Sequence, residues 1–302
     1  MNELNLKQES AANCELKASL ENYFMNRFIP ILFLLVSCTD KSQSNKSFAL
    51  ALKSDTLIIQ NRLSEAEQVI KEAIHLDSSN YIAYNNLAIV RIKTNSPSEK
   101  VVDAFTKSLA INPYYATALF SLTNFYYDKK DYSNAIIYST KYLSILKKGS
   151  ESDSDISRLY TIRAESRNMK KEFDEALLDS DSALNYNKNS YWAYKERGSA
   201  YRQLNLYTDA ITNYSKALDI NPAYAQAYNG LAICYDDAKI DFNKALINYT
   251  KAIELDPKNG TYVYNRGACL YDNGFKEKAR PDFIKADSLG KFEAKSYLKK
   301  YL

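Results

Sequence analysis

The sequence is poor in glycine, proline, cysteine and histidine, and each shortage excludes a class of protein. Its 302 residues include 7 Gly and 6 Pro, too few for the many tight turns of a β-protein. The single histidine, His75, leaves little scope for histidine-based catalysis or metal binding. The four cysteines, Cys14, Cys38, Cys234 and Cys269, are too scattered for a disulfide framework or a zinc motif. No cofactor or metal ion is therefore expected.

Charge of one sign is not concentrated in any stretch either. Lys and Arg total 40, Asp and Glu total 36, and the net charge of +4 is spread along the chain. A nucleic-acid-binding protein usually gathers its basic residues into one patch, so nucleic acid is not an expected partner. The sequence also lacks a glycine-rich phosphate loop, a Ser-His-Asp set and a pair of catalytic carboxylates. These absences indicate a protein that is not an enzyme.

An apolar run from Phe28 to Val36 follows a basic residue, Arg27. The run is too short to cross a bilayer core, which needs about 20 apolar residues, but it suits a secretory signal. Its end, Leu35-Val36-Ser37-Cys38, resembles the lipobox of bacterial lipoproteins. The resemblance implies that residues 25–37 are a signal peptide, that the chain is cut before Cys38, and that the Cys38 thiol receives a lipid.

The segments on either side of this run are interpreted on the assumption that it is a lipoprotein signal. Residues 1–24 carry four Glu and two Lys, unlike the basic start of a signal peptide, so they are expected to be a mis-assigned upstream extension. Residues 38–46 are polar and predict a flexible tether. No acidic run follows Cys38, which favours a periplasm-facing protein of the cell envelope. In the alternative interpretation, Phe28 to Cys38 form a buried helix of a cytoplasmic protein.

A sequence repeat occupies the C-terminal part of the chain. The segment 209–222 recurs at 244–257 and partly at 278–286, with its first alanine at Ala210, Ala245 and Ala279. The repeat resembles the tetratricopeptide repeat (TPR), a pair of antiparallel helices with a period of 34 residues. Small residues let the two helices approach, aromatic residues fill the gaps, and proline ends the second helix. Unit 191–224 matches at Tyr194, Gly198, Tyr201, Ala210, Tyr214, Ala217 and Pro222.

The TPR pattern also accounts for much of the tyrosine content, which is 26 residues against 12 Phe and 1 Trp. The aromatic positions of a TPR unit lie between its helices, where a tyrosine ring is buried while its hydroxyl reaches water or a neighbouring turn. Most tyrosines are therefore expected to be structural.

The resemblance predicts an all-α fold, a TPR α-solenoid in which helix-turn-helix repeats form a right-handed superhelix. The stride from Ala135 to Ala176 is 41 residues instead of 34, so an insertion is expected to form a hinge at 150–156. The hinge separates an N-terminal sub-array at 47–149 from a C-terminal sub-array at 157–290. Residues 291–302 predict a capping helix. The expected units are 47–80, 81–115, 116–149, 157–190, 191–224, 225–259 and 260–293.

In TPR proteins the first helix of each pair lines a concave groove, and ligand contacts come from fixed positions on that helix. Carried over to this chain, those positions predict a groove that binds a protein or peptide. Its candidate residues are Phe120, Asn124, Tyr127, Trp192, Lys195, Arg202, Asn229, Asp236, Tyr264 and Tyr271.

Trp192 is the only tryptophan of the chain. Because Tyr194 already fills the core aromatic position of its unit, Trp192 either points into the groove or packs against the preceding second helix. Tryptophan is enriched at binding hot spots, which favours the groove. One TPR subclass binds C-terminal carboxylates through Lys and Asn at set positions. Here Lys195 is followed by Ser199, so this clamp is incomplete and acidic C-termini are not expected ligands.

The predicted function is a non-catalytic scaffold, tethered to a bacterial membrane through Cys38 and binding envelope proteins in its groove. The runner-up is a cytoplasmic TPR adaptor without a lipid anchor. The identity of the partner and the oligomeric state are left open by the sequence.

Overall fold

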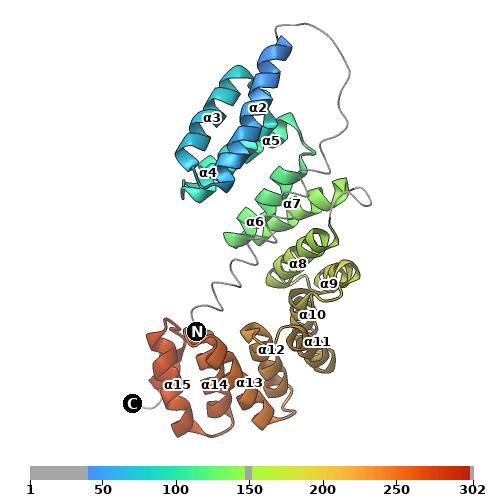
Figure 1. Cartoon of the computed structure of the whole chain (residues 1–302). Helices are drawn as coiled ribbons and strands as arrows, with labels where there is room; N and C mark the ends of the chain where they lie inside the picture. The colour runs from blue at the N-terminus through green and yellow to red at the C-terminus, as the bar shows by residue number, and fades with distance from the viewer. Residues whose placement is uncertain (1–39, 147–151, 300–302) are drawn as a thin grey trace. The chain divides into compact units, whose positions relative to one another are not determined.

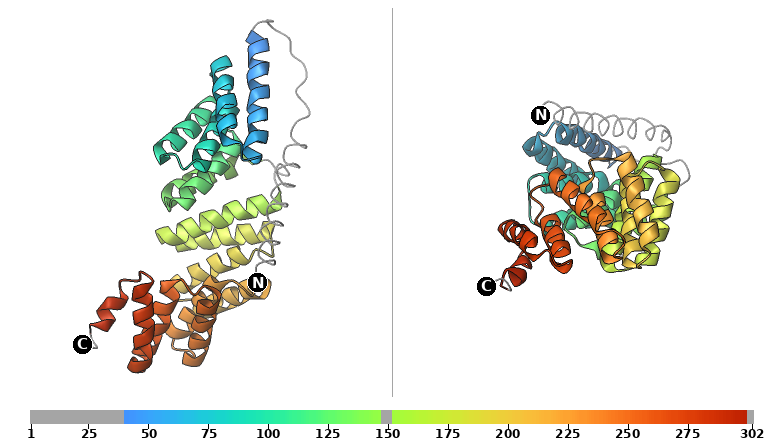
Figure 2. Two further views of the ribbon diagram at one scale, coloured as in Figure 1. Left: turned by 60° about the vertical axis from the view of Figure 1, so that its left-hand side comes forward. Right: turned by 90° about the horizontal axis from the view of Figure 1, so that it is seen from below.

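The protein is all-α in the computed structural model, which describes residues 40–146 and 152–299 (Figure 1). Within these residues there are 15 helices and no strand. The helices form consecutive antiparallel pairs, as expected of an α-solenoid, and the two helices of a pair lie side by side in Figure 2. None of the described helices is long and apolar enough to cross a membrane.

Seven helix pairs follow one another along the chain, and each overlaps one predicted unit, although α2 and α8 begin at Asp40 and Asp153, before the predicted starts at 47 and 157. The first helix of a pair is called helix A below, and the second is called helix B. In chain order the pairs are α2 (Asp40–Ile59) with α3 (Leu63–Leu76), α4 (Tyr81–Lys93) with α5 (Ser98–Ile111), α6 (Ala116–Asp128) with α7 (Tyr132–Ile145), α8 (Asp153–Lys170) with α9 (Phe173–Tyr186), α10 (Tyr191–Gln203) with α11 (Tyr207–Ile220), α12 (Ala225–Asp237) with α13 (Phe242–Leu255), and α14 (Gly260–Asp272) with α15 (Lys276–Ser288), followed by α16 (Ala294–Leu298).

The turn between helix A and helix B has the same backbone form in all seven pairs. One residue of each turn has a positive φ, the left-handed conformation that commonly ends a helix. Asparagine and glycine adopt this conformation at least cost, whereas three of the turns use lysine. The turn residues are Asn61, Asn95, Lys130, Lys171, Asn205, Lys239 and Gly274.

Alanine lets the helices of a pair approach closely. In the three C-terminal pairs, two alanines of each helix B are fully buried, as the repeat pattern predicts. A buried aromatic ring from the same helix B fills the space beside them: Tyr214, Tyr249 and Phe283 are at most 3% exposed. The alanines are Ala210, Ala217, Ala245, Ala252, Ala279 and Ala286.

The chain divides into two compact units between Pro113 and Tyr114, which corrects the predicted hinge at 150–156. The first unit contains α2 to α5, and the second contains α6 to α16. Residues 153–156, expected in the hinge, are instead the first turn of α8, where the Ser152 side chain accepts a hydrogen bond from the Asp155 N–H. Because α7 and α6 both pack against α8, the predicted boundary lies inside one unit.

The predicted tether at 38–46 is also corrected, because α2 begins at Asp40. The polar residues that suggested a flexible segment find partners on neighbouring elements. Ser44 Oγ donates to Asp77 (2.8 Å), and the buried Ser47 Oγ donates to the Ala73 carbonyl (2.7 Å) and accepts from Asn80 (2.8 Å). The predictions for residues 1–24, for the signal peptide at 25–37 and for Cys38 lie outside the described residues.

The C-terminal cap is shorter than predicted. Residues 291–302 were expected to form one helix, but α16 is five residues long and residues 300–302 are outside the described part. It still covers the apolar side of the last pair: Ala294 is fully buried, and the Tyr297 ring stacks on Phe283 with centroids 4.4 Å apart. A capping element of this kind closes the end of a repeat array.

Candidate partner-binding face

The ten predicted groove residues all lie on A helices of the second unit and are half-buried. They are called the helix-A face below. Half-burial means that each side chain packs against a neighbour on one side and reaches solvent on another. Three come from α6 (Phe120, Asn124, Tyr127), three from α10 (Trp192, Lys195, Arg202), two from α12 (Asn229, Asp236) and two from α14 (Tyr264, Tyr271).

At the α6 end, the helix-A face is linked to α8 by Arg158. The Arg158 guanidinium donates to Asn124 Oδ1 (3.2 Å) and lies 6.0 Å from the centre of the Phe120 ring. Asn124 in turn donates to the Phe120 carbonyl one helical turn earlier (2.8 Å). A cation over an aromatic face is attracted by the ring quadrupole, so this end of the face presents a positive charge held against an aromatic ring.

At the centre, Trp192 of α10 contacts residues of two other A helices, α6 and α8, and one of its own helix. Its indole Nε1–H donates to Glu165 of α8 (2.8 Å) and to Glu196 of α10 (3.1 Å). Its ring lies 6.0 Å from that of Tyr127 on α6. These contacts are with A helices, which is the arrangement expected if Trp192 belongs to the helix-A face.

The same centre buries three ionisable groups together. The Lys195 ammonium contacts the carboxyl of Glu196 and lies 3.6 Å from Glu165 Oε2. The side chains of Lys195, Glu165 and Glu196 are 12%, 22% and 2% exposed. Burial by itself lowers the pKa of Lys195, but the charges of Glu196 and Glu165 outweigh it and raise the pKa well above its ordinary value. Lys195 is therefore charged at any physiological pH.

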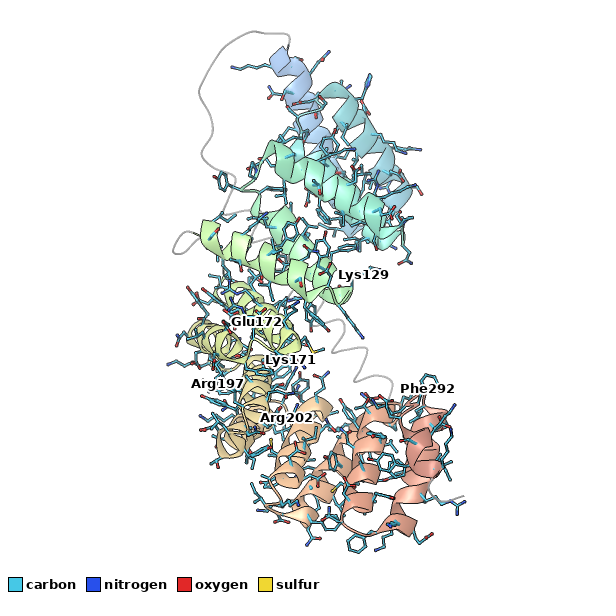
Figure 3. All side chains as sticks on the ribbon, turned by 180° about the vertical axis from the view of Figure 1, so that it is seen from behind. Lys129, Lys171, Glu172, Arg197, Arg202 and Phe292 are labelled. Carbon is cyan, nitrogen blue, oxygen red and sulfur yellow. The ribbon has the colours of Figure 1, made fainter. Side chains whose placement is uncertain are left out.

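Arg202 lies in the last turn of α10 and is labelled in Figure 3. It lies near the hydroxyl of the buried Tyr214 and near Asp237. Its Nε is buried and has no hydrogen-bond partner among the described residues. Burial raises the pKa of Tyr214 to about 12, and Arg202 opposes part of that rise. Arg202 thus stabilises its own helix pair as much as it forms part of a surface.

Asn229 and Asp236 are both engaged within the array. Asn229 Oδ1 accepts a hydrogen bond from Asn265 of the next A helix (2.9 Å). Asp236 Oδ2 accepts one from the buried Tyr249 hydroxyl (3.4 Å), and burial raises the pKa of the Asp236 carboxyl. Asn229 therefore joins two A helices, whereas Asp236 faces the helix B of its own pair.

Tyr264 and Tyr271 belong to the C-terminal cap. Their ring centroids lie 6.0 Å and 5.1 Å from that of Tyr297, and 6.0 Å and 6.3 Å from that of the buried Phe283. The positions that would face a following repeat are covered here by the capping segment. This end of the helix-A face is an aromatic cluster.

Four further residues contact the helix-A face and were missed by the sequence analysis. Arg158, Glu165 and Asn168 occupy the same positions of unit 157–190 that were used in the other units, so applying the pattern to that unit would have found them. Glu196 lies at a position that was not among those used to predict the groove, and no sequence signal singled it out. Asn168 donates to both the carbonyl and the carboxyl of Glu196 (2.9 Å and 3.0 Å).

The two described cysteines are core residues. Cys234 and Cys269 are buried, unpaired, and at most 1% exposed. Burial raises the pKa of the Cys234 thiol to about 12, which keeps it in the unreactive thiol form. In residues 40–146 and 152–299, no group of three or more His, Cys, Asp or Glu side chains is arranged to hold a metal ion.

Comparison with known families and proteins gives consistent matches. A family model described as TPR repeat matches residues 198–236, and one described as Tetratricopeptide repeat matches residues 225–259. TPR repeat-containing protein MJ1428 of Methanocaldococcus jannaschii is 30% identical over 161 residues, covering 52% of this chain and 28% of that protein. The DnaJ homolog subfamily C member 7 homolog of Dictyostelium discoideum is 25% identical over 268 residues, covering 86% and 46%. The chain thus spans less than half the length of these relatives.

Solved structures show the same fold at low sequence identity. A tetratricopeptide repeat protein from Parabacteroides merdae superposes with a TM-score of 0.63 at 20% identity, covering 84% of this chain and 98% of that one. YrrB, described as a TPR protein with an unusual peptide-binding site, gives a TM-score of 0.51 at 23% identity, covering 62% and 92%.

Proposed function

Because this chain contains tetratricopeptide repeats, we propose that it is a non-catalytic scaffold that holds a protein or peptide partner on its helix-A face. TPR proteins are in general protein-interaction scaffolds. The proposal is supported chiefly by the half-buried aromatic and charged side chains that recur on the A helices from α6 to α14. Trp192, Tyr127 and Arg202 are of the residue types that dominate binding energy in protein interfaces.

Photo-crosslinking in living cells tests where the partner binds. A photoreactive amino acid placed at Gln203, an exposed residue in the last turn of α10, is expected to give a discrete crosslinked product. The matched control is Thr212, an exposed residue of α11, the helix B of the same pair, which is expected to give none. Equal products at both positions, or none at Gln203, would contradict binding at the helix-A face.

The finer proposal is that the scaffold is a bacterial lipoprotein anchored through Cys38, with partners in the cell envelope. It is supported by the apolar run 28–36 and by the lipobox-like sequence that ends in Cys38. A single lipid chain binds membranes weakly, so stable anchoring requires the further acyl chains that bacterial lipoproteins carry. The alternative is a cytoplasmic adaptor in which Cys38 is unmodified.

Fatty-acid labelling distinguishes these two locations. Wild-type chain expressed from Met25 in a bacterial host is expected to incorporate labelled fatty acid, whereas Cys38→Ser is not. Cys14→Ser in the chain that begins at Met1 controls for the other N-terminal cysteine and is expected to keep the label. Label that persists in Cys38→Ser, or is missing from the wild type, would leave the cytoplasmic adaptor as the better proposal.

A further inference from the structure

The centre of the helix-A face holds two carboxyl groups and one ammonium group, all largely removed from water. Glu165 Oε2 lies 3.6 Å from the Lys195 ammonium, which also contacts Glu196. The two carboxyl groups lie on the same indole N–H, with Trp192 Nε1 2.8 Å from Glu165 Oε2 and 3.1 Å from Glu196 Oε1, so they are close neighbours. The indole N–H of Trp192 donates to both of them. With every group ionised, this buried cluster would carry one uncompensated negative charge.

A buried uncompensated charge is costly, and two carboxylates in contact repel each other. A hydrogen bond between two carboxyl groups requires a proton on one of them. A single proton held by Glu196 would allow that bond and would make the cluster neutral: one ammonium, one carboxylate and one carboxylic acid. Glu196 is the better proton carrier because it is 2% exposed, whereas Glu165 is 22% exposed.

The buried Tyr214 of α11 and Tyr262 of α14, whose pKa values burial raises, lie near Lys195, and further titratable groups act on the two carboxyl groups. Glu165 comes from α8, Lys195 from α10, Tyr127 from α6, Tyr132 from α7, and Tyr224 from the turn before α12. Burial also raises the pKa of Tyr127, Tyr132 and Tyr224, so they are neutral under the same conditions. Lys195 is the one cation among them.

The environments of the two glutamates push their pKa values apart. Burial raises the pKa of Glu196 from 4.5 to about 8, against the opposing effect of Lys195. Burial also acts to raise the pKa of Glu165, but the charge of Lys195 and the neighbouring polar groups of Glu196, Trp192 and Tyr127 outweigh it, so its pKa is lowered. This is the pattern of a carboxyl pair that titrates as a unit with one proton between its members.

We propose that Glu165 and Glu196 share one proton beside Lys195, and that its loss in mildly alkaline solution switches the centre of the helix-A face from neutral to negative. The switch is a property of the cluster itself and does not depend on any partner. Its effect on binding rests on the proposed function: above the midpoint, the face favours partner segments that carry lysine or arginine. Below the midpoint, that preference is lost.

Trp192 is a built-in reporter, because it is the only tryptophan and donates to both carboxyl groups. Full-length protein is titrated from pH of about 6 to about 10 while tryptophan emission is recorded. The wild type is expected to show one transition with a midpoint near pH 8. Glu196→Gln, which keeps the shape and the hydrogen-bonding capacity but cannot ionise, is expected to show none. Glu254→Gln, an exposed glutamate of α13, is the matched control and should keep the transition.

A second measurement uses the wild type alone and therefore does not depend on a variant folding. Carbon NMR of side-chain-labelled glutamate is expected to show one carboxyl resonance that titrates above pH of about 7, far from the ordinary glutamate range. An emission profile that is flat across the range, or that is unchanged in Glu196→Gln, would overturn the proposal. A set of glutamate resonances that all titrate in the ordinary range would overturn it as well. Either failure leaves the crosslinking test of the proposed function untouched.

Discussion

Two regions of the second unit, the centre around α8 and α10 and the C-terminal end around α14, each bind an arginine of helix A through the same set of contacts. Arg163 on α8 donates from Nε and Nη2 to the two oxygens of Asp179 on α9 (2.9 and 2.6 Å), and from Nη1 to Thr140 on α7 (3.0 Å). Each such arginine therefore ties helix A to its own helix B and to the preceding one. Planar, bidentate bonding of this kind is particular to arginine.

The C-terminal pair repeats this arrangement. Arg266 on α14 donates to the two oxygens of Asp282 on α15 (both 2.8 Å) and to Thr250 on α13 (3.1 Å). A variant of it occurs in α10, where Arg197 donates to Asn213 of α11 (2.7 Å) and pairs with Asp181 of α9. Figure 3 labels Arg197 on α10.

On the helix-A face the two regions differ completely. The centre carries Glu165, Lys195 and Glu196 around Trp192, whereas the C-terminal end carries aromatic rings packed on Tyr297. The shared arginine contacts preserve the geometry of the repeat. The helix-A face is therefore where the units can vary without loss of the fold, and it is the surface on which partner specificity can be built.

The largest expected effect is the removal of the Phe283 ring from the C-terminal cluster. Phe283 is fully buried and contacts Tyr264, Tyr271 and Tyr297, so Phe283→Ala should lower the free energy of unfolding of this end by about 3–5 kcal/mol. Repeats interact mainly with their neighbours, so the loss should be confined to α14–α16. Hydrogen exchange of peptides from 260–299 and from 153–186 measures the two regions separately.

The neighbouring residue provides the control for this prediction. Ile284 is 53% exposed, and Ile284→Ala should change stability by less than about 0.5 kcal/mol. The emission of Trp192, which lies at the centre, should be unchanged in both variants. Faster exchange throughout the second unit in Phe283→Ala would show that the two regions are more strongly coupled than their different chemistry suggests.

A smaller loss is expected from breaking the arginine contact at the same end. Asp282→Ala leaves the Arg266 guanidinium, 27% exposed, without its carboxylate, at a cost of roughly 2–4 kcal/mol. The pair α12/α13 has Leu231 and Ile247 at the equivalent positions. Replacing Arg266 by Leu and Asp282 by Ile should therefore recover most of the loss. Urea unfolding followed by circular dichroism compares the single and double variants.

The equivalent change at the centre sharpens this comparison. Asp179 accepts from two arginines, Arg163 and Arg167, and its side chain is 3% exposed. Asp179→Ala should therefore cost more than Asp282→Ala. At the C-terminal end, the double variant Arg266→Leu with Asp282→Ile is the decisive comparison. If it is as unstable as Asp282→Ala alone, Arg266 stabilises the fold by more than its ion pair with Asp282.

Much of this fold could be predicted because the TPR pattern is local. Alanine and aromatic residues at fixed spacing, such as Ala210 and Tyr214, specify the contact within a pair, and each pair depends mainly on its neighbours. The division of the chain at Pro113 could not be predicted, because it depends on how whole pairs pack. The start of α2 at Asp40 was hidden because its polar residues find partners, such as Asp77, that are distant in sequence.

The helix-A face was predicted in part for the same reason. The spacing placed Trp192 and Lys195 on helix A, and the structure brings them together. The partners of these two residues depend on three-dimensional packing between successive pairs. Glu165 comes from a unit with a weaker pattern, and Glu196 lies at a position that was not used to predict the groove. A sequence pattern gives positions on a helix, but not which charges meet between helices.

The smallest effect is expected from replacing a glycine by alanine at the same repeat position in the two regions, Gly198 at the centre and Gly267 at the C-terminal end. A Cβ at Gly198 would lie 3.2 Å from the Tyr214 ring, and one at Gly267 would lie 3.2 Å from the Phe283 ring. Alanine is favoured over glycine in a helix by up to about 1 kcal/mol, which offsets part of the crowding. The outcome therefore depends on whether each ring can move.

Tyr214 has little freedom, because Gly230 of the next A helix already contacts its phenol end, whereas Phe283 is backed by Tyr297 of the five-residue α16. Gly198→Ala is therefore expected to cost about 1 kcal/mol. Gly267→Ala is expected to cost less but not zero, because its added Cβ would also lie 3.1 Å from the Asp282 Cβ, which cannot move without α15. Urea unfolding of the two variants measures the difference. Equal costs would show that α16 holds the Phe283 ring as firmly as the following repeat holds the Tyr214 ring. The centre and the C-terminal end would then differ in their side-chain chemistry but not in their rigidity.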